Sequence, residues 1–232
     1  MREIEFIEEL NSHGIRLEQR QIEQFREYAA FLKEYNEKIN LTAITEIEEI
    51  YEKHFYDSLL LAFHSNMEGR LVDVGTGAGF PGVVLKIAFP DLRVILIEPL
   101  KKRCVFLNEL IAKLGLKDIE VINDRGEDYS LLHREEYDFV TARAVTNLSA
   151  LIEICGAMVK VGGYFVALRA LSGQKEISEA SNAIAKMGFK IEDVLEEKLS
   201  DGSIRVIGYL CKDKASPLKF PRNYSMIKRK PL

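Results

Sequence analysis

The residues with the clearest chemical potential form a glycine-rich segment, in which Asp73 is followed by Gly75, Gly77 and Gly79. A turn of this kind between a strand and a helix lets the backbone approach a ligand closely, because glycine has no side chain to hold the ligand away. Glu98 comes 19 residues after Gly79, at the expected end of the next strand. A carboxylate at that place accepts hydrogen bonds from both hydroxyls of a ribose. The spacing therefore predicts a ligand that contains adenosine.

The loop taken alone is compatible with two adenosine cofactors. The stretch from Gly77 to Gly82 satisfies the pattern of dinucleotide-binding proteins. NAD, however, places its pyrophosphate on the amides of a helix N-terminus, where Pro81 supplies no N–H, and Glu98 would repel the ribose phosphate of NADP. S-adenosylmethionine has no phosphate, and Asp73 or loop carbonyls can hold its ammonium while loop N–H groups hold its carboxylate. The pattern favours S-adenosylmethionine and leaves an NAD-linked oxidoreductase as an alternative.

Two further strand ends carry polar residues toward the same edge of the expected sheet. The turn at Arg125, Gly126 and Glu127 follows the third strand and is placed to flank an adenine, and Arg143 ends the fourth strand and would point into the site. Loops at such sheet edges carry a disproportionate share of function. The alternative interpretation is that Glu127 and Arg143 are solvated loop charges.

Hydrophobic periodicity predicts the elements that must position these residues. Residues 1–66 form an N-terminal helical region, and its expected helices are Glu3–Ser12, Leu17–Ile39 and Glu46–His64, the last one capped by Thr45 with Glu48 at capping-box spacing. Residues 67–212 alternate short apolar strands with helices, which predicts an α/β domain with a doubly wound, mostly parallel sheet. Residues 213–232 form a basic C-terminal tail without clear periodicity.

The alternating segments can be placed individually. The expected strands are rich in β-branched or aromatic residues and lie at Leu71–Val74, Arg93–Ile97, Ile119–Ile122, Phe139–Thr141, Tyr164–Leu168 and Ile204–Leu210. The expected helices between them are Pro81–Ala88, Lys102–Leu114, Leu148–Val159 and Lys175–Met187.

Composition and charge narrow the class of protein. The chain is 47% hydrophobic and 29% charged, which excludes a disordered chain, and it lacks an apolar run long enough for a membrane span. Its start is acidic and unlike a signal peptide, and Cys104, Cys155 and Cys211 form no metal-ligand spacing. We therefore expect a cytoplasmic protein that uses no metal and contacts no membrane.

Charge is distributed unevenly along the chain. Residues 1–66 carry 7 Lys and Arg against 14 Asp and Glu, whereas residues 212–232 carry 7 Lys and Arg against 1 Asp. This polarity indicates either a polyanionic partner at the basic end or a tail that only aids solubility.

The motifs together resemble one family, the bacterial ribosomal RNA small subunit methyltransferase G family, also called glucose-inhibited division protein B. The resemblance spans nearly the whole chain in the order of the family and is carried by Asn40-Leu41-Thr42-Ala43, His54-Phe55-Tyr56-Asp57-Ser58, Val72 to Gly82, Lys102-Arg103, Arg125 to Glu127, Thr141-Ala142-Arg143-Ala144, Phe220-Pro221-Arg222 and Lys230-Pro231-Leu232. Two positions depart from the family. Gly126 stands where the family usually has Ala, and Leu168-Arg169-Ala170-Leu171 stands in place of an expected Lys-Gly.

The resemblance implies a Rossmann-like methyltransferase that moves a methyl group from S-adenosylmethionine to N7 of a guanine in the decoding-region loop of 16S rRNA. It also implies cofactor contacts at Gly75, Phe80, Gly126, Glu127 and Arg143. Guanine N7 already exposes a lone pair, so we expect catalysis by positioning and no catalytic general base. The spacing of His54 and Asp57 on a predicted helix favours a hydrogen-bonded surface pair.

A nucleic-acid partner requires stacking aromatics and basic residues near the site. With no Trp in the chain, the stacking candidates are Phe80, Phe220 and Tyr224. The basic residues interleaved with them, and expected to contact RNA, are Lys101, Lys102, Arg103, Lys219, Arg222, Lys228, Arg229 and Lys230. On this interpretation the segment 217–232 binds RNA, and cofactor affinity does not depend on it.

The expected partner is 16S ribosomal RNA or the small ribosomal subunit, bound by a monomer. Two alternatives besides the oxidoreductase stay open at this point. One is a methyltransferase of another RNA, a protein or a small molecule, which would need a closed apolar substrate pocket and would leave the basic tail idle. The other is a non-catalytic module that binds the cofactor or RNA without turnover.

Overall fold

A seven-stranded sheet forms the centre of the protein, which is described by a computed structural model over residues 1–143 and 146–232. The strands are ordered β3-β2-β1-β4-β5-β7-β6. Strands β1 to β5 run parallel, whereas β7 is antiparallel to both β5 and β6. The strand bounds are β1 (Arg70–Val74), β2 (Arg93–Ile97), β3 (Ile119–Ile122), β4 (Tyr137–Arg143), β5 (Val159–Ala170), β6 (Phe189–Lys198) and β7 (Ile204–Lys212). The predicted doubly wound, mostly parallel sheet is confirmed.

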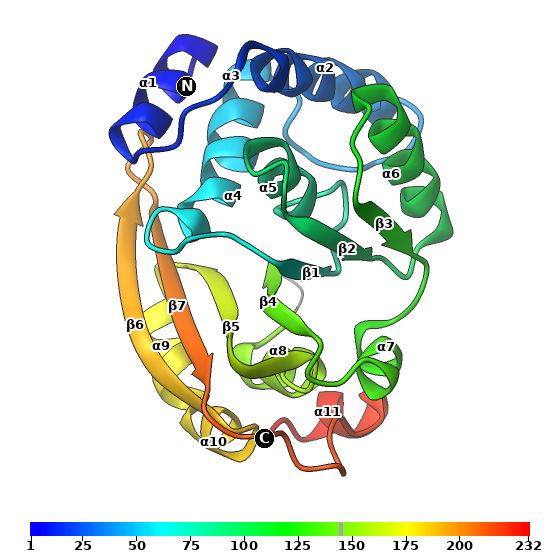
Figure 1. The fold of residues 1–232 in the computed structure, drawn as a ribbon, viewed down its shortest axis with the longest axis vertical. Coiled ribbons are helices and arrows are strands. Elements are labelled where there is room, and N and C mark those ends of the chain that lie inside the picture. Colours follow the sequence, from blue (N-terminus) through cyan, green and yellow to red (C-terminus); the bar gives the residue numbers. More distant parts are fainter. Residues whose placement is uncertain (144–145) are drawn as a thin grey trace.

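Helices cover both faces of the sheet (Figure 1). One face packs against α5 (Gly82–Ala88) and α6 (Lys101–Leu114), and the other against α7 (Gly126–Leu132), α8 (Leu148–Cys155), α9 (Gly173–Glu179) and α10 (Ser181–Lys186). Each face has its own apolar core, because strand residues alternate in direction and a buried parallel sheet is apolar on both sides. The carboxyl ends of β1, β2 and β4 consequently meet at one edge.

The N-terminal helical region joins the first of these cores. Its elements are α1 (Glu3–Ser12), α2 (Gln19–Asn36) and a continuous helical segment made of α3 (Ile47–Ile50), the π-helical η1 (Tyr51–Tyr56), α4 (Asp57–Leu59) and the 3₁₀ turn η2 (Leu60–Ala62). Phe25 and Phe55 pack with ring centroids 5.1 Å apart, and Tyr28 stacks on Phe80 of the glycine loop at 5.5 Å. The helical region therefore shares its core with the sheet and contacts the predicted ligand loop directly.

Some predicted boundaries are wrong. Thr45 does not cap the third helix, which begins at Ile47 after Glu46 and has no side-chain cap. The predicted helix Lys175–Met187 is two helices that meet at Ala180, and the predicted helix Leu148–Val159 ends at Cys155 because β5 already begins at Val159. The tail, expected to lack periodicity, contains the helix α11 (Tyr224–Arg229).

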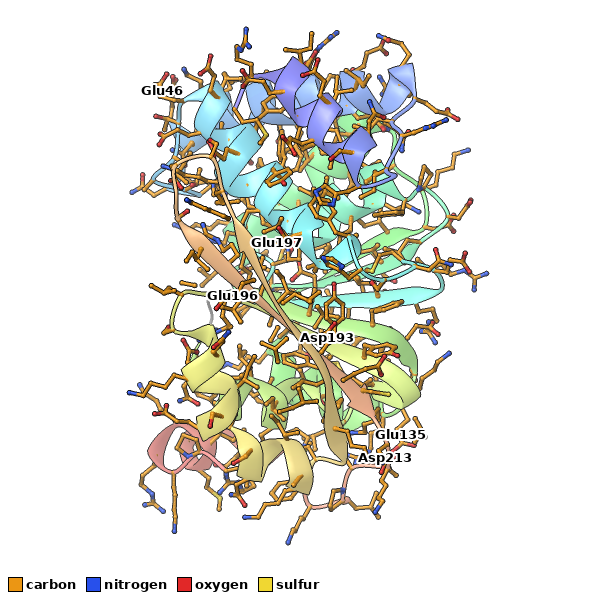
Figure 2. All side chains as sticks on the ribbon, turned by 90° about the vertical axis from the view of Figure 1, so that its left-hand side faces the viewer. Glu46, Glu135, Asp193, Glu196, Glu197 and Asp213 are labelled. Atoms are coloured by element: carbon orange, nitrogen blue, oxygen red, sulfur yellow. The ribbon has the colours of Figure 1, made fainter. Side chains whose placement is uncertain are left out.

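Strand β6 was missed by the sequence analysis altogether. It lies at the edge of the sheet and pairs with β7 alone. Figure 2 shows Asp193, Glu196 and Glu197 along it. Because an edge strand is half exposed and is often protected by charge, its apolar signal is weak. Within the described ranges no helix is long and apolar enough to cross a bilayer, and no group of three His, Cys, Asp or Glu residues could hold a metal ion.

Candidate functional site

The glycine loop after β1 is fixed from behind by Asp73. The carboxylate is fully buried, and its Oδ2 accepts hydrogen bonds from the Thr76 hydroxyl at 2.6 Å and from the Gly82 amide at 2.8 Å. Among the described residues Oδ1 has no hydrogen-bond partner. Burial raises the pKa of Asp73 to about 6, because a carboxylate away from water disfavours its charged form. Asp73 therefore shapes the loop, and it does not line the cavity in front of the loop.

The loop needs glycine because its backbone is left-handed at three positions. The φ angles are +70° at Gly75, +63° at Gly77 and +99° at Gly79. A Cβ at Gly79 would lie 2.7 Å from the Tyr28 hydroxyl, which donates a hydrogen bond to the Ala78 carbonyl at 2.5 Å. A Cβ at Gly77 would meet only open space, its nearest contact being the Gly75 carbonyl at 4.0 Å. The loop is thus packed tightly on α2 and left clear on its outer side.

Glu98 stands at the end of β2 opposite the glycine loop. Its carboxylate is almost completely buried and accepts hydrogen bonds from the Gly77 amide at 3.0 Å and the Leu100 amide at 2.9 Å. Each oxygen has one of these bonds, so each retains an acceptor position. Arg103 lies 3.7 Å from Glu98. The predicted meeting of Glu98 with the glycine loop is therefore observed.

Two cavities open along this edge of the sheet. The first, about 430 Å³, is lined by Gly75, Thr76, Gly77, Ala78 and Phe80 of the glycine loop and by Leu41, Thr42, His54, Glu98, Pro99, Leu100, Arg103 and Arg143, whereas Gly79 lies outside its wall. The second, about 340 Å³, is lined by Val74, Gly75, Pro99, Leu100, Arg125, Gly126, Glu127, Thr146, Leu151, Ile154 and Tyr224. Gly75, Pro99 and Leu100 belong to both walls, so the two cavities are the two ends of one site that lies across the carboxyl ends of β1 and β2.

Gly126 and Glu127, which the sequence analysis expects to flank an adenine, line the second cavity. A Cβ on Gly126 would lie 2.6 Å from Val74 Cγ1 and 2.9 Å from Ile154 Cγ2. The absence of a side chain at Gly126 thus lets Val74 and Ile154 close the floor of the cavity. Burial raises the pKa of Glu127 above its ordinary value.

Arg143 is the centre of a polar network in the first cavity. Its guanidinium donates to Asp57 Oδ2 at 3.0 Å and to His54 Nδ1 at 3.3 Å, and it lies 5.0 Å from the centroid of the Phe80 ring. Burial, and next the charge of Arg143, lower the pKa of His54 to about 3, so the imidazole is neutral near pH 7. The predicted exposed pair of His54 and Asp57 is wrong, because both side chains are buried and meet through Arg143.

Among the described residues, the Thr42 hydroxyl has no hydrogen-bond acceptor within the network. A guanidinium only donates, so Nδ1 of neutral His54 must accept from Arg143 and its Nε2–H must donate to the Thr42 hydroxyl 2.8 Å away. The Thr42 oxygen also accepts from the Ile44 amide at 3.0 Å. With both acceptor positions of its oxygen used, Thr42 presents its O–H to the cavity that it lines.

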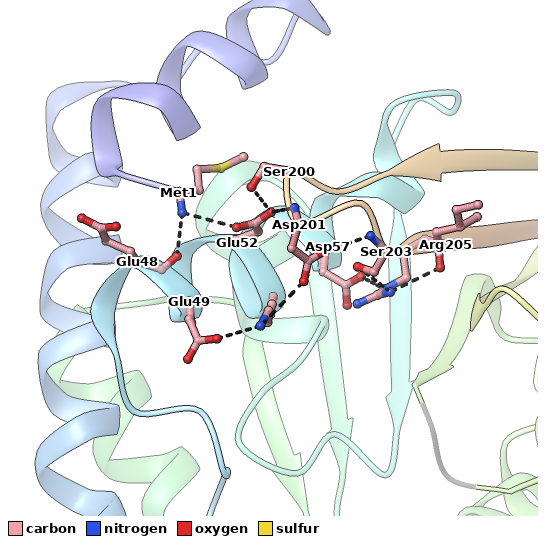
Figure 3. Close-up of polar contacts among 11 residues, drawn as sticks. Met1, Glu48, Glu49, Glu52, Asp57, Ser200, Asp201, Ser203 and Arg205 are labelled. Carbon is pink, nitrogen blue, oxygen red and sulfur yellow. Dashed lines mark hydrogen bonds and ion pairs between the residues drawn. The ribbon is translucent and has the colours of Figure 1, made fainter.

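The hairpin formed by β6 and β7 is tied to this network from the other side (Figure 3). Arg205 of β7 pairs with the second oxygen of Asp57. At the hairpin tip the Ser200 hydroxyl and the Asp201 amide donate to Glu52 of η1. Asp57 therefore lies between two arginines and fixes the helical segment against the sheet edge. Tyr28 and Arg205 are positioning residues that the sequence analysis missed. In the sequence, Tyr28 is one residue of an expected helix and Arg205 one residue of an expected strand, and neither belongs to a recognisable motif.

The residues predicted to contact RNA fall into three groups. Lys101 and Lys102 are exposed at the start of α6, whereas Arg103 is partly buried in the first cavity beside Glu98. Lys219, Lys228, Arg229 and Lys230 are exposed on the tail. Arg222 is instead bound to the fully buried Glu153, with its Nε 2.7 Å and its Nη2 2.6 Å from the carboxylate. Its assignment to RNA is corrected, because this ion pair occupies its guanidinium.

Two of the three aromatic candidates for base stacking are also corrected. Phe80 is 4% exposed beneath His54, with ring centroids 4.3 Å apart, and Phe220 is 5% exposed. Phe80 is stacked between the rings of His54 and Tyr28, and Phe220 is buried, so their rings are covered by described residues of the protein. Tyr224 is 40% exposed and lines the second cavity. Of the Thr141-Ala142-Arg143-Ala144 motif, Ala144 lies outside the described residues.

The segment 168–171, at the end of β5, connects neighbouring elements through Arg169. Arg169 donates through Nε to Glu176 of α9 at 2.8 Å and through Nη2 to the Thr146 carbonyl at 3.1 Å. It thereby connects α9 with the loop that follows β4.

Comparison with known proteins places this site in a family. A family model described as rRNA small subunit methyltransferase G matches residues 21–204. A ribosomal RNA small subunit methyltransferase G of Lysinibacillus sphaericus is 42% identical over 100% of both chains, and one of an Exiguobacterium species is 44% identical, also over 100% of both. Among solved structures, a SAM-dependent methyltransferase from Aquifex aeolicus aligns with a TM-score of 0.55 at 18% identity, covering 77% of this chain and 97% of the other. The M. jannaschii TYW2 protein in complex with AdoMet aligns with a TM-score of 0.56 at 20% identity, over 68% and 75% of the two chains. The structural likeness supports the fold.

Proposed function

The chain belongs to the rRNA small subunit methyltransferase G family, and from this we propose that it transfers the methyl group of S-adenosylmethionine to N7 of a guanine in the decoding-region loop of 16S rRNA. Family membership makes the chain a methyltransferase that uses S-adenosylmethionine, and so decides between the two adenosine cofactors that the loop left open. The observation that carries the proposal is the two-ended site over the glycine loop and Glu98.

The residues present fit this cofactor. In the first cavity Glu98 keeps free acceptor positions suited to ribose hydroxyls, and Gly77 leaves the space that a side chain would fill. The second cavity is walled largely by apolar atoms of Val74, Leu151 and Ile154, with Glu127 as a polar group, which suits an adenine. When bound, S-adenosylmethionine supplies an electrophilic methyl group carried on a sulfonium.

The demand on the protein is to hold the target base in line with that methyl group. Guanine N7 exposes a lone pair, so no proton has to be removed before attack, and positioning can supply a large share of the barrier reduction. His54 is a poor base, because its pKa is about 3 and its Nδ1 is occupied by Arg143. The Thr42 hydroxyl, which lines the first cavity, is placed to donate a hydrogen bond to an acceptor on the base. The chemistry of the cavity therefore agrees with catalysis without a general base.

The RNA is proposed to lie over the exposed basic residues that surround the site. Lys101 and Lys102 at the first turn of α6 adjoin Leu100, which lines both cavities. The exposed tail residues Lys228, Arg229 and Lys230 follow Tyr224 of the second cavity. We further propose that a monomer acts on 16S rRNA or the small subunit in the cytoplasm, because both cavities and these cations belong to one chain. Light scattering of the RNA-bound protein measures the mass of the complex and would test whether one copy of the chain is bound.

The direct test is methyl transfer to RNA. The protein is incubated with radiolabelled S-adenosylmethionine and either naked 16S rRNA or small subunits from cells that lack the modification, and the labelled nucleotide is mapped. We expect one labelled guanine in the decoding-region loop, and no label in a matched RNA fragment that carries 7-deazaguanine there, since this base has C–H in place of N7. Label on another base, or full label on the 7-deaza fragment, would refute the proposal.

A further inference from the structure

Tyr224 contributes to the cofactor site although it lies in the basic tail, 98 residues beyond Gly126 in the sequence. Its side chain lines the second cavity together with Gly126 and Glu127 of α7 and with Leu151 and Ile154 of α8. The residue is 40% exposed, so its neighbours in the protein leave much of its side chain uncovered.

The placement of Tyr224 is fixed by buried contacts on both sides of it in the sequence. Arg222 pairs with the buried Glu153 of α8, and its Nη2 also donates to the Lys230 carbonyl at 3.0 Å. Asn223 caps α11, its side chain accepting from the Met226 amide at 3.0 Å. Ile227 of the same helix is fully buried in the core on the α8 side of the sheet.

A second set of contacts attaches the start of the tail to the other wall of the cavity. Arg134, just beyond α7, donates to the Phe220 carbonyl at 2.7 Å and to the Ser216 carbonyl at 2.8 Å. Glu153 lies in α8 between Leu151 and Ile154, which face the cavity. The tail is therefore held by α8, which walls the second cavity, and by Arg134 close to the end of α7, the other wall helix, so Tyr224 has a defined position at the cavity.

We propose that Tyr224 stacks on the adenine of the cofactor and forms the outer wall of the adenine end of the site, so that the basic tail is part of cofactor binding. The proposal rests on the proposed function, because it takes the second cavity as the adenine end. Aromatic stacking is sequence-tolerant toward bases and needs only a held ring with one open face. Cofactor affinity then depends on the tail, contrary to the expectation from the sequence alone.

The first test measures binding without turnover. Calorimetry gives the dissociation constant of S-adenosylhomocysteine for the wild type, Tyr224→Ala, Tyr224→Phe and the control Met226→Ala, a residue of α11 with 42% exposure that lies outside the cavity wall. We expect Tyr224→Ala to weaken binding about three- to tenfold, as the loss of one stacking pair predicts. Tyr224→Phe and Met226→Ala should keep wild-type affinity. Melting temperature and circular dichroism establish that each variant is folded.

The second test uses the absence of tryptophan from the chain. Tyr224→Trp and Met226→Trp each create a protein with a single indole. Addition of S-adenosylhomocysteine should change the emission of the Trp at position 224 and leave that at position 226 unchanged. Wild-type affinity in folded Tyr224→Ala, or an unresponsive emission in a Tyr224→Trp protein that binds the ligand, would overturn the role of Tyr224 alone. A wild type that binds neither S-adenosylmethionine nor S-adenosylhomocysteine would overturn the proposed function as well.

Discussion

At the scale of single residues, Asp73 shows how a ligand loop carries a cost in stability. Its folded-state pKa of about 6 lies above its ordinary value of 3.8, because the carboxylate is buried and one oxygen has no partner among the described residues. A group whose pKa is higher in the folded than in the unfolded state contributes to the free energy of unfolding. For Asp73 this contribution is fully present below pH 3.8, and it is lost as the pH rises from 3.8 through 6. Ionised Asp73 thus destabilises the folded protein at neutral pH while it holds Thr76 and Gly82.

We predict that Asp73→Asn removes this pH dependence. The amide oxygen can still accept from Thr76 and Gly82, and no charge is buried. The difference in free energy of unfolding between variant and wild type should shift in favour of the variant by about 1–1.5 kcal/mol between pH 5 and pH 8. Urea unfolding at the two pH values measures it. A difference that stays constant with pH would contradict the assigned pKa.

Also at this scale, residue types and spacing were sufficient to predict which groups surround the glycine loop. Glu98, Gly126, Glu127 and Arg143 all line the site, because the ends of parallel strands must meet at one edge. The partners of Arg143 were not predictable, since His54 and Asp57 come from a helix whose docking depends on tertiary packing. For the same reason the sequence pattern placed them on an exposed face.

At the scale of elements, regular periodicity was predictive and edge positions were not. Helix α1 and strands β2 and β3 have the predicted bounds, because their apolar residues follow one period without interruption. Strand β6 escaped prediction because it is acidic and pairs on one side only, and α11 because its six residues bury Ile227 alone. Short or half-exposed elements give too little apolar signal for a pattern to detect.

The attachment of α11 to α8 leads to a prediction about stability. Arg222→Met leaves the fully buried Glu153 carboxylate without its charged partner, which should lower the free energy of unfolding by about 3–5 kcal/mol. The double variant Glu153→Met with Arg222→Met removes both charges and should recover most of this loss. Lys228→Met, an exposed residue of the same helix, is the control. Denaturant unfolding measures all of them, and an Arg222→Met protein as stable as the control would show that the pair contributes little.

At the scale of the whole molecule, charge is distributed along the longest axis. The N-terminal helices lie at one end and α11 at the other (Figure 1). Acidic side chains outnumber basic ones in the first 66 residues, and basic side chains outnumber acidic ones in the last 21. Between these ends the outer strand β6 carries Asp193, Glu196 and Glu197 along its length (Figure 2). A polyanion is repelled by this strand and by the acidic end, and attracted by the end that carries Tyr224 and the second cavity. The charge pattern therefore favours approach of RNA from the tail side.

This polarity predicts how RNA affinity responds to salt. Reversing Lys228, Arg229 and Lys230 to Glu should weaken binding of 16S rRNA. A plot of the logarithm of the binding constant against the logarithm of salt concentration should also become less steep, by about two to three units of slope. The reason is that each lost phosphate contact removes somewhat less than one released counterion. The affinity for S-adenosylhomocysteine should be unchanged, since these side chains are exposed and lie outside the cavity walls. Reversing Lys33 of α2, Lys38 just after α2 and Lys113 in the last turn of α6, all of them exposed, changes net charge equally and is the control. Equal loss of slope in both triple variants would mean that net charge, and not the tail, sets the attraction for RNA.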